Sequence, residues 1–201
     1  MNGLPSKLLQ RGLNVEYISL AWVSVACFVA VSAGVMASSL ALLAFGGDSI
    51  IDMISSWTVL SHLRRTEKAG GIDEENKTAN RIKTILTFLL VPTIIIGIVY
   101  SYLRGVAAEP SALGIGMVIG SVVIMPILAV EKNRIGSKGN LVQLSIDAME
   151  SWMCFFMSLA LLGGLVMNYL WGIWWADYFA ALIILVFIMS RALVSLQETK
   201  T

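Results

Sequence analysis

The chain has 201 residues, of which 57% are hydrophobic and only 13% are charged, and its formal net charge is +1. A soluble domain carries about 25% charged residues, so this composition is typical of an integral membrane protein. The nearly neutral balance provides no basic field that would attract nucleic acid. The two cysteines lie in separate apolar segments without metal-finger spacing, and the single histidine, His62, excludes a multi-histidine metal site.

Six long apolar runs follow one another along the chain, and each is long enough to cross a bilayer as a helix. They predict an all-α integral membrane protein with six transmembrane helices, at about residues 17–37, 40–63, 82–103, 112–130, 141–167 and 174–195. Residues 1–14 are expected to form an N-terminal cytosolic or interfacial segment, with Leu8, Leu9 and Leu13 facing lipid. The membrane domain then fills residues 15–197, and no C-terminal cytosolic domain is expected after it.

The distribution of Lys and Arg predicts the orientation of the spans. Thirteen of the 14 Lys and Arg residues lie on one side of the predicted membrane domain, in the N-terminus, residues 64–83, the 131–140 loop and the C-terminal end, and the exception is Arg104. Cytoplasmic loops carry the excess of positive charge. We therefore expect both termini to face the cytoplasm of a multi-pass membrane protein, in the cell membrane if the source is prokaryotic.

Two predicted spans contain acidic residues, which are costly in lipid and usually functional. Asp48 and Asp52 lie one turn apart in "GDSIIDMISS", and Asp147 and Glu150 lie in "SIDAMESW". A helix rises 1.5 Å per residue, so Asp52 lies roughly 12 Å from the inner surface of a ~30 Å core, and Asp147 roughly 9 Å from it. The two motifs thus fall at similar depth on antiparallel helices and are predicted to face each other.

Oxygen-bearing side chains from two helices make a plausible site for a divalent cation. Two unpaired carboxylates repel each other, and a divalent ion relieves that repulsion. Protons compete with a metal for the same oxygens, because ligands must be deprotonated to bind it. This competition provides a basis for exchanging metal against protons. The alternative is that protonated acids, or bonds from acids to hydroxyls, simply hold the helices together.

The sequence resembles the cation diffusion facilitator family of proton-coupled metal exporters over roughly residues 12–197. The similarity is carried by "SSLALLAFGGDSIIDMISSWTVLSHLRR", "DAMES" and "WWADYFAALIILVFIMSRALVSL", together with six spans and both termini inside. The chain looks like a short member without the cytosolic C-terminal domain. The resemblance implies a homodimer, which would here associate through the membrane part or the N-terminal segment.

The resemblance also implies a set of metal ligands. Asp48 and Asp52 come from the second helix and Asp147 from the fifth, where many members have histidine. The family's usual fourth aspartate is replaced by Ser151, so the fourth oxygen comes from Ser151, a water or the neighbouring Glu150. An all-oxygen shell favours Mn²⁺, but Zn²⁺ also accepts carboxylates and is the family's commonest substrate. Zn²⁺ is therefore expected first, with Mn²⁺ and Fe²⁺ close behind.

The leading functional hypothesis is an alternating-access exporter that carries a divalent metal out of the cytoplasm in exchange for protons. The metal is then the transported substrate, and no cofactor is expected. The main alternative is a membrane sensor or partner subunit that binds the metal without moving it, and a less favoured one is an exchanger of cationic drugs for protons. No phosphate loop, catalytic triad or soluble enzyme module is present, so the chain is not expected to be an enzyme.

Overall fold

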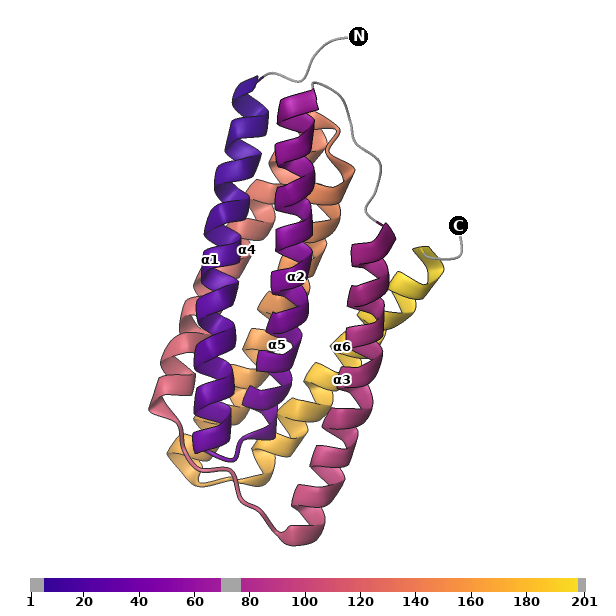
Figure 1. Cartoon of the computed structure of the whole chain (residues 1–201). Helices are drawn as coiled ribbons and strands as arrows, with labels where there is room; N and C mark the ends of the chain where they lie inside the picture. The colour runs from indigo at the N-terminus through magenta and orange to yellow at the C-terminus, as the bar shows by residue number, and fades with distance from the viewer. Residues whose placement is uncertain (1–5, 70–76, 199–201) are drawn as a thin grey trace.

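The computed structural model describes residues 6–69 and 77–198, and within them all regular structure is helical (Figure 1). All six helices are long and apolar enough to cross a membrane, so the six-span all-α fold is confirmed. The helices are α1 (Ser6–Met36), α2 (Leu40–Ala69), α3 (Lys77–Arg104), α4 (Ala112–Gly139), α5 (Val142–Trp171) and α6 (Trp175–Glu198).

Of the expected N-terminal segment, residues 1–5 lie outside the described residues, and residues 6–14 are not a separate element. Residues from Ser6 onward continue into α1 without a break. Leu9 and Leu13, predicted to face lipid, are instead buried against residues of α2 such as Leu60 and Leu63. The prediction was wrong because these leucines share a helix face that another helix covers, which an apolar count along one segment does not reveal.

Helix α4 extends well beyond its predicted end at residue 130. It runs to Gly139 and stops at Asn140, whose positive φ of 51° ends the helix while its N–H donates to the carbonyl of Gly136. An asparagine in the left-handed conformation is a common helix stop. The predicted 131–140 loop was therefore wrong, and Lys132 belongs to a helix.

The helices form a four-membered group with two further helices beside it (Figure 1). In the group, α1 packs against α2 and α4, and α5 packs against the same two helices. Helix α6 packs against α5 and α2, and α3 packs against α2 and α6. Consecutive helices run in opposite directions, so α1 begins and α6 ends on the same side of the bundle.

Two apolar clusters fill the bundle interior at different heights. The smaller lies toward the beginning of α1 and includes Leu13, Leu63 and Leu144. The larger fills the remainder and includes Phe45, Met157 and Ile184. On α1, α2 and α5 most of the buried residues between the two clusters are polar, so a polar layer crosses the bundle between two apolar ones.

Hydrogen bonds join the helices at the end of the bundle remote from the start of α1. Asp177, in the first turn of α6, accepts hydrogen bonds from Ser39 Oγ at 2.5 Å and from the backbone N–H of Leu40 at 2.8 Å. Asn168 Nδ2 donates to the carbonyl of Ala108 at 2.8 Å. Asp177 thus lies at the start of α6 and binds the free N–H groups at the start of α2.

Candidate cation site

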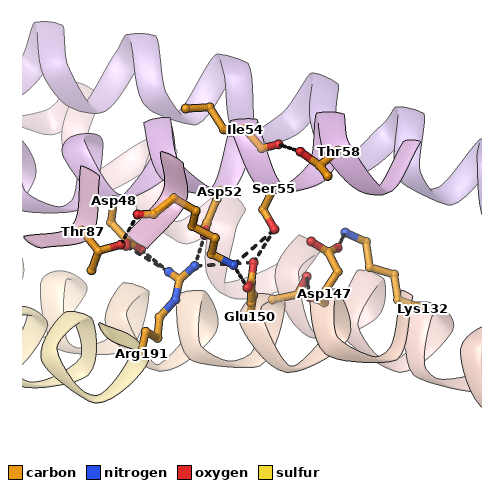
Figure 2. Close-up of polar contacts among 12 residues, drawn as sticks. Asp48, Asp52, Ile54, Ser55, Thr58, Thr87, Lys132, Asp147, Glu150 and Arg191 are labelled. Atoms are coloured by element: carbon orange, nitrogen blue, oxygen red, sulfur yellow. Dashed lines mark hydrogen bonds and ion pairs between the residues drawn. The ribbon is translucent and has the colours of Figure 1, made fainter. Parts of the chain in front are cut away.

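The polar layer collects charged side chains from all six helices, and Figure 2 shows its central part. Each apolar helix brings one or two charged residues to this level. On α1, α2, α4 and α5 these residues lie between members of the two apolar clusters, and on α3 and α6 they lie beside members of the larger cluster. The charged members are Glu16, Asp48, Asp52, Lys83, Lys132, Asp147, Glu150 and Arg191.

Arg191 of α6 holds the aspartate pair of α2 (Figure 2). Its Nη1 lies 2.9 and 2.8 Å from the two carboxylate oxygens of Asp48, and its Nη2 lies 2.5 Å from Oδ1 of Asp52. All three residues are buried. Because Asp48 and Asp52 are one helical turn apart, their carboxylates project from the same face and meet a single guanidinium.

Glu150 of α5 lies beside this group and is bonded to other helices. It forms an ion pair with Lys83 of α3, and its Oε2 accepts a hydrogen bond from Ser55 Oγ at 2.8 Å. The same Oε2 lies 3.6 Å from Nη2 of Arg191. Glu150 therefore joins the aspartate–arginine group to α3.

Asp147 belongs to a second ion cluster, on the other side of the layer. It pairs with Lys132 of α4, whose Nζ also donates to Ser19 Oγ at 2.6 Å and lies 3.2 Å from Oε2 of Glu16. Lys132 and Glu16 are almost wholly inaccessible, with 1% and 0% of their surface exposed. A buried charge is tolerated only when it is paired, and here one ammonium serves two carboxylates.

A small cavity of about 10 Å³ lies between the two ion clusters. Space of this size is near the minimum that holds one water or ion. Its lining combines carboxylates, hydroxyls and a thiol from α1, α2, α4 and α5: Ser19, Val23, Asp52, Ser56, Met125, Asp147, Glu150, Ser151 and Cys154.

The prediction that the acidic motifs of α2 and α5 face each other is confirmed, because Asp52 and Asp147 line one cavity. Glu150 and Ser151, the two candidates for the fourth ligand, line it as well. Asp48 sits one turn away, bound to Arg191. Ser151 Oγ donates to the carbonyl of Asp147 at 3.1 Å, as serines inside helices often do.

The residues do not form a ready-made metal shell. Among the residues that the structure describes, no three His, Cys, Asp or Glu side chains converge closely enough to hold an ion. The acids that were expected to surround a metal are instead held by basic side chains. Metal binding at the cavity would require these ion pairs to rearrange.

Sequence reasoning missed the basic partners Lys83, Lys132 and Arg191, which it counted as charges on one side of the membrane. It also missed Glu16, which precedes the first predicted span. The available signal was that each lies within a helical turn or two of long apolar runs, where an ionisable residue needs a partner. Cys154 was noted only as a cysteine without metal-finger spacing, yet its spacing of seven from Asp147 puts both on one helix face.

Comparison with known proteins adds one finding. A family model described as the cation efflux transmembrane domain matches residues 17–200. No curated protein matches the chain.

Proposed function

This chain belongs to the cation efflux family, and on that premise we propose that it exports Zn²⁺, or Mn²⁺ or Fe²⁺, from the cytoplasm in exchange for protons. Members of this family are multi-pass membrane transporters of cations, which supports a transport function for this chain. In the proposed cycle the site opens alternately to each face of the membrane. Two copies associate through their membrane-embedded helices, and native mass spectrometry in detergent would detect the pair.

The observation that carries this proposal is the cavity between α2 and α5. Four residues with oxygen-bearing side chains, Asp52, Asp147, Glu150 and Ser151, line one small space in the interior of the bundle. Carboxylate oxygens are ligands for all three metals, and protons bind the same atoms. A site that binds either species, but not both together, couples their movements in opposite directions.

The formal charges of the polar layer support exchange of a divalent ion. Five carboxylates and three basic side chains meet there, so the fully ionised layer carries a charge of −2. One divalent cation or two protons neutralise that charge. Because a neutral layer is the least costly to expose to the low dielectric of the membrane, this balance favours a stoichiometry of two protons for each metal ion. The carboxylates are Glu16, Asp48, Asp52, Asp147 and Glu150, and the basic residues are Lys83, Lys132 and Arg191.

The chemistry of the lining supports zinc as the first substrate to test. Oxygen donors alone would suit Mn²⁺ at least as well. Cys154 adds a thiol to the cavity wall, and Zn²⁺ accepts sulfur as readily as oxygen, whereas Mn²⁺ prefers oxygen. Replacing this thiol by a hydroxyl in Cys154→Ser should therefore narrow the preference for Zn²⁺ over Mn²⁺.

The test is metal flux in proteoliposomes made with the purified chain. Zn²⁺ should cross the membrane only when a proton gradient drives protons in the opposite direction. Asp52→Asn should abolish this flux because a cavity carboxylate is lost. Glu109→Gln is the matched control, since this exposed acid lies outside the polar layer and should leave transport unchanged. Metal binding by calorimetry without any flux would contradict the proposal and favour a non-transporting sensor.

A further inference from the structure

We propose that Arg191 is a tethered competitor of the transported metal: its guanidinium occupies the Asp48–Asp52 carboxylates in the metal-free protein and must leave when a metal ion binds. This inference rests on the proposed function and extends it. In this view the guanidinium of Arg191 occupies the carboxylates between transport events, and Arg191 therefore sets the affinity of the site for metal.

The contact geometry makes the two cations mutually exclusive. Both oxygens of Asp48 and Oδ1 of Asp52 accept hydrogen bonds from Arg191 at 2.5–2.9 Å. A zinc ion binds carboxylate oxygens at about 2.0–2.2 Å and needs the same lone pairs. A guanidinium left in place would also put a positive charge directly against the metal, inside a buried site where such repulsion is strong.

Glu150 offers the displaced guanidinium a second acceptor. Its Oε2 is 3.6 Å from Nη2 of Arg191, so a small side-chain movement converts this contact into a full ion pair. Without such an acceptor, metal binding would leave Arg191 buried and unpaired, which is strongly unfavourable. In this arrangement Glu150 receives the arginine and does not act as the fourth ligand, which leaves Ser151 or water for that position.

A tethered cation changes how a transporter releases its cargo. A guanidinium keeps its positive charge at any physiological pH, so it returns to the aspartates whenever the metal leaves. Removing it should strengthen metal binding and slow release. Loss of a merely structural ion pair would have the opposite effect on binding, because the site would become less ordered.

The experiment compares Zn²⁺ binding by isothermal titration calorimetry in nanodiscs. Arg191→Gln should bind Zn²⁺ at least about tenfold more tightly than the wild type, because no tethered charge competes. Arg191→Lys is the conservative control and should stay close to the wild type. In flux assays Arg191→Gln should lower both KM and kcat, as expected when release becomes limiting.

A double-mutant cycle with Glu150→Gln separates the two roles of the glutamate. If Glu150 receives the displaced arginine, Glu150→Gln alone weakens Zn²⁺ binding, but Arg191→Gln/Glu150→Gln binds as tightly as Arg191→Gln. If the double variant binds weakly, Glu150 is a ligand and its proposed role is overturned. Should Arg191→Gln fail to fold, as judged by thermal denaturation, the charge-matched Arg191→Gln/Glu150→Gln variant decides: Zn²⁺ binding tighter than in the wild type supports the inference, and equal or weaker binding overturns it.

The outcomes also distinguish this inference from the proposed function. Zn²⁺ binding that Asp52→Asn abolishes, but that Arg191→Gln leaves equal or weaker, would retain the transport site and overturn the competition. Absence of binding in the wild type and in Arg191→Gln, together with absence of flux, would overturn both.

Discussion

Lys132 is the single basic partner of two buried carboxylates from different helices. Its Nζ pairs with Asp147 of α5 and lies 3.2 Å from Glu16 of α1. In the part of the chain that the structure describes, neither acid forms an ion pair with any other basic side chain. Loss of the lysine would therefore leave two negative charges facing each other in the bundle interior, at a cost that greatly exceeds that of losing an exposed ion pair.

We predict that Lys132→Met destabilises the protein by about 3–5 kcal/mol, the range for breaking a buried ion pair. Thermal denaturation in detergent would measure the change. The matched control is Lys132→Met/Asp147→Asn, which also removes one of the stranded charges and should recover much of the loss. Equal stability of the wild type and Lys132→Met would contradict a charge-pairing role.

The acidic residues of the site could be predicted from the sequence, but their basic partners could not. Asp48, Asp52 and Asp147 were visible because a carboxylate inside an apolar run is anomalous by itself. Their partners were not, because a lysine or arginine near the end of an apolar run is equally typical of a membrane boundary. Which base meets which acid depends on helix packing across the whole chain, as in the pairing of Asp48 with Arg191.

At the scale of elements, the close approach of α4 and α5 depends on Gly136. A Cβ built on this residue would lie 2.3 Å from Ser145 Oγ and 2.9 Å from the backbone N of Ser145. The backbone atom cannot move without shifting α5. The two helices are joined by Asn140 and Leu141 alone, so the contact between Gly136 and Ser145 lies directly beside a tight connection. Gly136 also lies one helical turn from Lys132, which pairs with Asp147.

Gly136→Ala should therefore destabilise the protein by about 1–3 kcal/mol, as overpacking of a tight interior typically does. Thermal denaturation in detergent would again provide the measurement. Gly116→Ala, in the same helix, is the control: a Cβ there meets no atom within 4 Å, so stability should not fall. A loss of stability in Gly116→Ala equal to that in Gly136→Ala would contradict the role of the Ser145 contact, because the higher helix propensity of alanine favours both variants.

Hydropathy predicted the existence of all six helices but not their full lengths. It detects the part of a helix that is apolar enough for lipid, so the polar end of α4 was interpreted as a loop. The helix continues because no residue between 131 and 138 breaks it, and Gly139 and Asn140 provide the stop. The start of α1 was misread for the related reason that its leucines pack on α2 instead of lying in the interface.

At the scale of the molecule, we propose that the end of the bundle at which α1 begins faces the cytoplasm. All the Lys and Arg residues except Arg104 lie toward that end or beyond it, although Lys83, Lys132 and Arg191 are engaged in ion pairs. The remaining basic residues still satisfy the positive-inside rule. The hydrogen bonds from Ser39 to Asp177 and from Asn168 to the carbonyl of Ala108 then lie at the outer end of the bundle.

Cysteine accessibility in intact cells would test this orientation. In a background without Cys27 and Cys154, Glu109→Cys should react with a membrane-impermeant maleimide, because this exposed residue lies at the outer end. Lys138→Cys, exposed at the opposite end of α4, should react only after the cells are permeabilised. The reverse pattern would invert the topology and hence the proposed direction of export.

The pairing of Arg191 with Asp48 across 143 residues has a consequence for biosynthesis. Helix α2 leaves the ribosome with two carboxylates whose basic partner in the described structure, Arg191, belongs to another helix. At a synthesis rate of about 5–20 residues per second, Arg191 follows Asp48 roughly 7–30 s later. For that interval α2 must remain beside the insertion machinery or take up protons, since two bare charges in lipid are too costly. Stable insertion of α2 therefore waits for the synthesis of α6, so these two helices are expected to assemble together instead of one after the other.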